Sequence, residues 1–158
     1  MKVKSIPASC ILIAALIVIG VSCKKSTEDT PTPTPDFSQL IGGWSGLTND
    51  NDTVNIVVSN VGGILKVTTY EYTVIYVSGS SKWTHWTRTS YSGGFCNVTN
   101  KAFSLIPEMS GGSPADSLSG TFNVTNLTLA GNIKATFTEV TGSPVVRLTY
   151  TATKLPTK

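Results

Sequence analysis

The sequence predicts an all-β fold, a single small antiparallel β-barrel, with a two-sheet β-sandwich as the alternative. Three observations support it. Apolar and polar residues alternate with a period of two over most of the chain after residue 43. Clusters of Gly, Asn, Ser and Asp interrupt the alternation, as hairpin turns do. Charged residues make up 13% of the 158 residues and hydrophobic residues 40%, which argues against disorder or a long surface helix.

The first 22 residues have the three parts of a secretory signal peptide. Lys2 and Lys4 give a basic start, residues 6–21 are almost wholly apolar, and small residues lead to Cys23. The alternative is a retained transmembrane helix, which needs about 20 apolar residues and therefore more than this stretch offers.

Gly20-Val21-Ser22-Cys23 resembles the lipobox of bacterial lipoproteins, with Gly20 where Leu is usual. The resemblance implies cleavage before Cys23, a diacylglycerol on its thiol and a further acyl chain, such as palmitate, on its amine. Two or three acyl chains are enough for stable membrane attachment. Secretion with a free Cys23 is the alternative.

The charged residues after Cys23 resemble the export signals of lipoproteins from Bacteroidota. They are Lys24, Lys25, Glu28 and Asp29. The resemblance implies a location in the cell envelope, lipid-anchored at the outer membrane and facing the periplasm or the cell surface.

Residues 23–36 are expected to form the lipidated start of a Pro/Thr-rich tether. Alternating Pro and Thr exclude a helix or an interior strand, because Pro fixes φ and lacks an amide donor. An extended chain of this kind rises about 3.1 Å per residue. The folded domain is then expected at residues 37–158.

Nine strands and one helical turn at residues 37–41 follow from the alternation and the turn clusters. The expected strands are 43–48, 53–60, 64–77, 82–91, 94–98, 101–106, 117–123, 127–139 and 145–154. The eighth is long for one strand, which predicts a bend near Gly131. Its inward row is Leu127, Leu129, Gly131, Ile133, Ala135 and Phe137, and Val146, Leu148, Tyr150 and Ala152 form the matching row of the last strand.

Gly42-Gly43-Trp44, just after the helical turn, resembles the Gly-x-Trp opening of lipocalin-like barrels. The resemblance implies a small lipocalin-like β-barrel lipoprotein of the kind common in Bacteroidota, often without an assigned activity. It places Trp44 at the closed end of the barrel, with an Arg of the last strand packed against it. Arg147 is the candidate for that Arg, although it is out of phase with the inward row.

No catalytic constellation is recognisable, and we predict that the protein is not an enzyme. His85 is the one histidine, and no nucleophile elbow accompanies it. Cys96 is interpreted as a small packed residue, and residues 49–52 as a hairpin turn rather than a calcium site. We expect no metal and no cofactor.

Loss of Lys2 and Lys4 leaves ten basic residues against nine acidic ones, which disfavours nucleic acid as a partner.

Aromatic residues gather in the third and fourth expected strands. Trp83 and Trp86 have opposite parity, so a regular strand places them on opposite faces of the sheet. Polar-tipped aromatic rings suit stacking on sugars or lining a barrel mouth, and core or sheet-surface packing is the alternative. The candidate ligand-binding residues are Tyr70, Tyr72, Trp83, His85 and Trp86, with Tyr76 and Tyr91 nearby.

The sequence therefore favours a membrane-anchored envelope lipoprotein, a non-enzymatic binding module for a small hydrophobic or glycan ligand. The alternative is a structural or accessory subunit of an envelope protein complex, which binds another protein through residues 83–91. An enzyme is the third alternative. The expected partners are the membrane, through the lipid anchor, and such a ligand or envelope protein.

Overall fold

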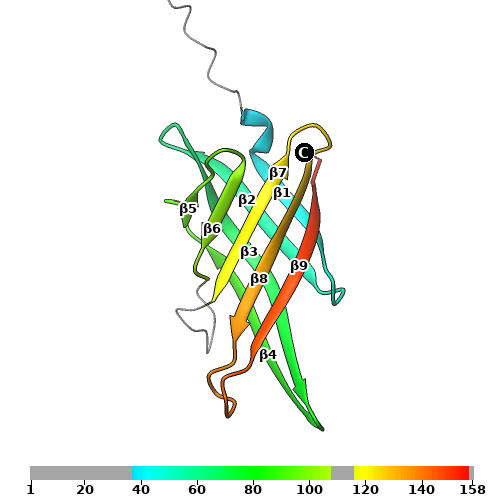
Figure 1. Cartoon of the computed structure of the whole chain (residues 1–158). Helices are drawn as coiled ribbons and strands as arrows, with labels where there is room; N and C mark the ends of the chain where they lie inside the picture. The colour runs from blue at the N-terminus through cyan, green and yellow to red at the C-terminus, as the bar shows by residue number, and fades with distance from the viewer. Residues whose placement is uncertain (1–36, 108–115, 157–158) are drawn as a thin grey trace, which may run out of the picture. The chain divides into compact units, whose positions relative to one another are not determined.

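The computed structural model describes residues 37–107 and 116–156 of a folded unit at Pro35–Lys158 (Figure 1). The expected signal peptide, Cys23 and the tether lie outside the described residues.

A short 3₁₀ turn and nine strands make up the described part of the chain. The turn, η1, spans Ser38–Leu40, inside the predicted helical turn. The strands are β1 (Gly42–Thr48), β2 (Thr53–Val61), β3 (Ile64–Ser78), β4 (Ser81–Ser90), β5 (Cys96–Asn97), β6 (Ala102–Leu105), β7 (Ser117–Asn123), β8 (Thr128–Thr136) and β9 (Val145–Lys154).

The strands form one continuous antiparallel sheet rather than two packed sheets. Its order is β4-β3-β2-β1-β9-β8-β7-β6, with β5 paired to β3. The sheet curls round so that β7, β8 and β9 lie in front of β2 and β3 (Figure 1). The all-β, barrel-like prediction is therefore confirmed.

The short β5–β6 hairpin links the two sides of the curled sheet. β5 pairs with the first part of β3, and β6 pairs with β7. Asn100 and Lys101 form the turn between them, and both have positive φ, at 50° and 62°. This is the geometry of a type I′ turn, whose twist suits a two-residue hairpin loop.

At the end of the sheet that lies at the bottom of Figure 1, the β3–β4 hairpin and the β8–β9 loop project. β3 and β4 stay paired from Thr69↔Ser90 to Ser78↔Ser81. We call this end the flared end: residues 72–85 of the hairpin with residues 137–144 after β8. β4 is the edge strand on this side of the sheet, and its second edge pairs with no strand of the described ranges.

The bend predicted near Gly131 is not where the sheet is irregular. β8 pairs in regular register through Gly131, and the register shifts instead between Val57 and Val58 of β2. A Cβ at residue 131 would lie 2.0 Å from the Ser119 carbonyl oxygen and 2.6 Å from the Tyr150 hydroxyl. Gly131 is therefore required for close packing, because Tyr150 crosses it to donate a hydrogen bond to that carbonyl oxygen at 3.0 Å.

Three further details of the predicted strands are wrong. β8 ends at Thr136 rather than residue 139, and β5 contains only Cys96–Asn97. Leu127 was expected in the inward row, but it has a positive φ of 50° and is 37% exposed. It belongs to the turn before β8, where local turn geometry overrides the alternation.

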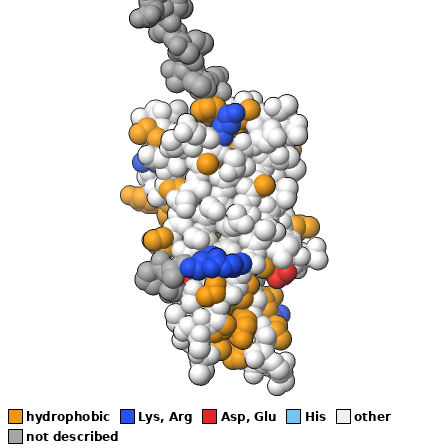
Figure 2. All heavy atoms as spheres, viewed as in Figure 1, with side chains coloured by type: hydrophobic (Ala, Val, Ile, Leu, Met, Phe, Trp, Pro, Cys, Tyr) orange, Lys and Arg blue, Asp and Glu red, His pale blue; other side chains and the backbone are white. Residues whose placement is uncertain are grey.

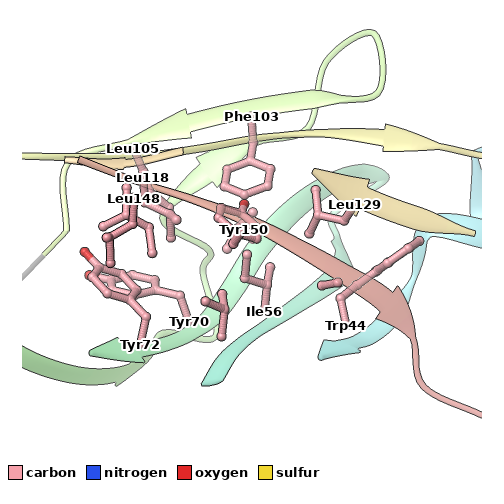
Figure 3. Close-up of a cluster of buried hydrophobic side chains, with 14 of the residues drawn as sticks. Trp44, Ile56, Tyr70, Tyr72, Phe103, Leu105, Leu118, Leu129, Leu148 and Tyr150 are labelled. Carbon is pink, nitrogen blue, oxygen red and sulfur yellow. The ribbon is translucent and has the colours of Figure 1, made fainter. Parts of the chain in front are cut away.

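Trp44 anchors one end of the core and is fully buried. Its indole Nε1 donates a hydrogen bond to the Leu40 carbonyl oxygen at 3.0 Å, and its ring meets Phe122 edge-on at 4.9 Å. Figure 3 shows Trp44 and Tyr72 at opposite ends of the row of buried side chains. η1 thus covers this end of the barrel through Trp44.

The predicted contact between Arg147 and Trp44 is wrong. Arg147 is exposed and lies opposite Lys134 of β8, whereas Trp44 lies opposite Lys154, seven residues further along β9. At about 3.3 Å per residue the two side chains are far apart. Arg147 faces outward because it alternates with the buried Leu148.

Candidate functional site

Tyr70 and Tyr72, two of the predicted ligand-binding residues, are core residues. Both are fully buried, their rings stack at 6.2 Å, and Phe95 meets Tyr70 edge-on at 4.8 Å. Figure 3 shows them inside the curled sheet. Burial is the main cause that raises the pKa of the Tyr72 hydroxyl, and neighbouring Tyr70 acts in the same direction. In this packing they fill the interior, and a ligand does not reach them.

Trp83 and His85 do come together, at the flared end of the barrel. Both point inward from β4, where Tyr76 lies directly opposite Trp83 in the register. The Tyr76 ring lies 5.6 Å from that of Trp83 and 5.6 Å from that of Phe137. His85 stacks on Phe137 at 4.0 Å between ring centroids.

We call these four rings, together with Glu139, the aromatic end cluster. Phe137 is fully buried, whereas Tyr76 and Trp83 are half-buried. Glu139 is 40% exposed at the rim. Figure 2 shows hydrophobic side chains gathered at this end of the molecule. The cluster thus offers a partly accessible aromatic surface next to a carboxylate.

Glu139 fixes the orientation of the buried His85 ring. His85 is 3% exposed, and its Nε2 lies 2.8 Å from Oε1 of Glu139. A hydrogen bond from the backbone N–H of Glu139 itself is the largest cause that lowers the pKa of the Glu139 carboxylate, and the hydrogen bond with His85 adds to it. An ionised carboxylate can only accept a hydrogen bond, so the proton in this bond is on Nε2 of His85.

The other ring nitrogen of His85, Nδ1, is not hydrogen-bonded to any described residue. In the neutral imidazole, a proton on Nε2 makes Nδ1 an acceptor. Nδ1 is buried and has no hydrogen-bond partner among the described residues. A buried polar atom without a partner is costly and calls for an explanation, such as a water or ligand donor.

Trp86 lies on the opposite face of β4, as its parity predicted. It is 54% exposed and lies opposite Thr73 of β3 on the outer surface. Arg88 and Glu71 face each other at 3.9 Å on the same outer surface. Trp86 is therefore separated from Trp83 and His85 by the thickness of the sheet.

Two adjoining hollows of about 390 and 410 Å³ flank Tyr91, and together we call them the Tyr91 groove. Ser90 and Tyr91 line both hollows. The hydroxyl side chains of the groove come from separate strands, and only the pairing register brings them together. A row of outward Ser and Thr on neighbouring strands is the one sequence signal that could have indicated it.

Cys96 is half-buried in β5. Burial raises the pKa of its thiol, and hydrogen bonds with the backbone of Ser104 and Val67 oppose the rise only in part. A raised thiol pKa lowers the thiolate fraction at neutral pH. These properties fit the predicted packing role.

The turn predicted at residues 49–52 is confirmed. Thr48 Oγ1 accepts hydrogen bonds from the backbone N–H groups of Asp50, at 3.2 Å, and Asp52, at 3.1 Å. Asn51 has a φ of 64°, which Asn tolerates better than most residues. Within residues 37–107 and 116–156, no group of three His, Cys, Asp or Glu side chains gathers to hold a metal ion.

No helix in the described ranges is long and apolar enough to span a membrane. No family model matches the chain, and neither a curated protein nor a solved structure shows significant similarity to it.

Proposed function

We propose that this protein is a membrane-anchored envelope lipoprotein and that its barrel is a non-enzymatic binding module. The anchor rests on the signal-peptide pattern of the first 22 residues and on the lipobox-like Cys23. The Pro/Thr-rich segment holds the module away from the lipid. The aromatic end cluster is the proposed binding site.

The observation that carries the proposal is that Nδ1 of His85 is buried without a hydrogen-bond partner in the described part of the chain, beside half-buried aromatic rings. The core side chains occupy the interior, so a ligand binds at the flared end instead. A ligand hydroxyl that donates to Nδ1 removes an unpaired buried acceptor, which costs about 1–3 kcal/mol. Tyr76 and Trp83 supply an apolar wall. The proposed ligand is therefore small and mostly apolar, with one hydrogen-bond donor.

The His85–Glu139 pair favours binding over nucleophilic catalysis. In a hydrolytic triad, the imidazole nitrogen that does not face the carboxylate bonds the nucleophile hydroxyl. No described side chain bonds to Nδ1 of His85.

A matched pair of model ligands tests the site. Calorimetric titration should show that the domain binds 2-naphthol about fivefold to tenfold more tightly than naphthalene, since one net hydrogen bond is worth about 1 kcal/mol. His85→Phe keeps a ring on Phe137 but has no acceptor, so the preference should disappear. Trp86→Phe, on the outer face, is the control and should change neither affinity. Equal affinity of the unmodified protein for both ligands, or no binding of either, contradicts the proposed site.

A separate experiment tests the anchor. Bacterial cells that express the full chain should incorporate an alkyne-tagged palmitate into this protein, and Cys23→Ala should abolish the label. Unlabelled, soluble protein with its first 22 residues intact would rule the anchor out.

A second candidate, an accessory subunit of an envelope complex, is favoured by the position of β4. β4 is one of the two edge strands of the sheet, and its Trp86 is 54% exposed. Exposed edges and aromatic side chains suit protein contacts.

A photo-crosslinking residue at position 86 should then capture a defined partner in the envelope. The same residue at position 47 is the control, because Leu47 is 52% exposed on β1. Equal capture at both positions counts against this candidate.

A further inference from the structure

The Tyr91 groove forms where the chain leaves the sheet and returns to it. β4 ends at Ser90 and β5 begins at Cys96. Tyr91 and Phe95 each donate a backbone hydrogen bond to β3, to the carbonyl oxygens of Thr68 and Val67, both at 2.8 Å. Both ends of this loop are therefore fixed to β3. The two hollows, about 390 and 410 Å³, lie within the usual range for small-molecule sites, about 300–1,000 Å³.

The Tyr91 ring between the hollows is exposed but held in place. It is 58% exposed, yet a Cβ at Gly93 would lie 2.8 Å from the ring. Phe95 packs against it at 5.9 Å and connects it to buried Tyr70. Lys66 Nζ donates to the Gly93 carbonyl oxygen at 3.2 Å and ties the loop to β3. A ring that is already positioned loses little entropy when a ligand stacks on it.

The polar lining consists of neutral side chains. Ser59 bonds Thr68 at 2.9 Å between hydroxyl oxygens, and Thr69 bonds Ser90 at 3.0 Å. Each hydroxyl has one donor and two acceptor lone pairs, so each pair keeps hydrogen-bonding capacity for a ligand. Asn60 and Ser92 extend this lining, and among the described residues no charged side chain lines either hollow.

We infer that the Tyr91 groove is a binding site for a neutral carbohydrate. The flat face of a sugar ring stacks on Tyr91, and its hydroxyls exchange hydrogen bonds with Ser90, Thr69 and their neighbours. A charged ligand would lose hydration there without gaining an opposite charge, which disfavours it. The site lies apart from the aromatic end cluster and is independent of the function proposed for it.

Calorimetric titration with neutral and acidic tetrasaccharides tests this inference. The neutral probes are gluco-, manno-, galacto- and xylo-tetraose, and the acidic probe is galacturonic acid tetramer. At least one neutral probe should bind with millimolar affinity or better, and the acidic probe more weakly. Tyr91→Ala should weaken that binding roughly tenfold, whereas Tyr91→Trp should keep it. Thr69→Val, which keeps the shape and removes one hydroxyl, should weaken it severalfold.

Two control variants separate this site from the other surfaces. Trp86→Ala removes an exposed ring from the outer face of β4, and His85→Phe alters the flared end. Neither should change carbohydrate affinity, and Tyr91→Ala should not change 2-naphthol affinity. The inference is overturned if no neutral probe binds, if the acidic probe binds as tightly, or if Tyr91→Ala and Trp86→Ala have equal effects.

Discussion

The carboxylate of Glu139 ties the β8–β9 loop to β4 through a single contact with His85, 2.8 Å long. The two residues are 54 positions apart in the chain. Glu139 is 40% exposed, so water shares the carboxylate and the bond contributes little to global stability. Its main effect is local, because it holds the imidazole ring in one orientation.

The lowered pKa of Glu139 predicts a pH dependence of stability. The folded state favours the ionised carboxylate, so this stabilisation is complete above the ordinary value of 4.5 and is lost as the pH falls through the lower folded value. Glu139→Gln should remove it. Urea denaturation from pH 7 to pH 3 should show the variant less stable at pH 7, and the difference should shrink as the pH falls below 4.5. A constant difference across this range would contradict the assignment.

Cys96 should react slowly with thiol reagents while the protein is folded. Burial raises the pKa of its thiol, and the thiolate is the reactive form. On the domain without Cys23, a colorimetric disulfide reagent at pH 8 should label Cys96 at least about tenfold faster in denaturing urea than in buffer. Equal rates would mean that the thiol is exposed and that β5 is not docked on β3.

At the scale of elements, turn chemistry and period-two alternation made most strands predictable. The bounds of β7 and β9 are as expected, because buried and exposed residues alternate along both strands. β8 is shorter than its alternation suggests, since Phe137 remains buried although it no longer pairs as a strand residue. Burial and strand pairing usually coincide, and the sequence pattern reports only burial.

The close packing of β7, β8 and β9 predicts that one methyl group added at residue 131 strongly lowers the stability of the domain. In Gly131→Ala the new Cβ would meet the Ser119 carbonyl oxygen and the Tyr150 ring, so the strands must separate. The loss of stability should exceed about 3 kcal/mol, at the upper end for overpacking. Gly63→Ala is the control: its φ is 85° but the space is open, so it should cost only about 1–2 kcal/mol. Thermal or urea denaturation measures both, and equal losses would contradict the packing.

At the scale of the whole domain, the curled sheet has two unlike ends. η1 and Trp44 cover one end, and the aromatic end cluster occupies the other. Side chains fill the space between them (Figure 3). The sheet thus serves as a rigid support, and the surfaces open to a ligand are its flared end and its outer wall.

The candidate site was only partly predictable from the sequence. Parity placed Trp83 and Trp86 on opposite faces, and the structure confirms it. Parity could not distinguish the buried Tyr70 and Tyr72 from the half-buried Tyr76, because the three share one face of β3. The strands on the opposite side of the barrel cover only part of the inward face of β3. How far they extend along it depends on long-range strand pairing, which no local sequence pattern encodes. The meeting of His85 with Glu139 depends on the same long-range pairing.

The three indole N–H resonances of the domain test the central claim most directly. Trp44, Trp83 and Trp86 lie at the covered end, at the flared end and on the outer wall. When 2-naphthol is titrated into ¹⁵N-labelled protein, the Trp83 indole signal should shift progressively while those of Trp44 and Trp86 stay in place. A shift confined to Trp86, or no shift of Trp83 at saturation, would contradict a binding site at the flared end.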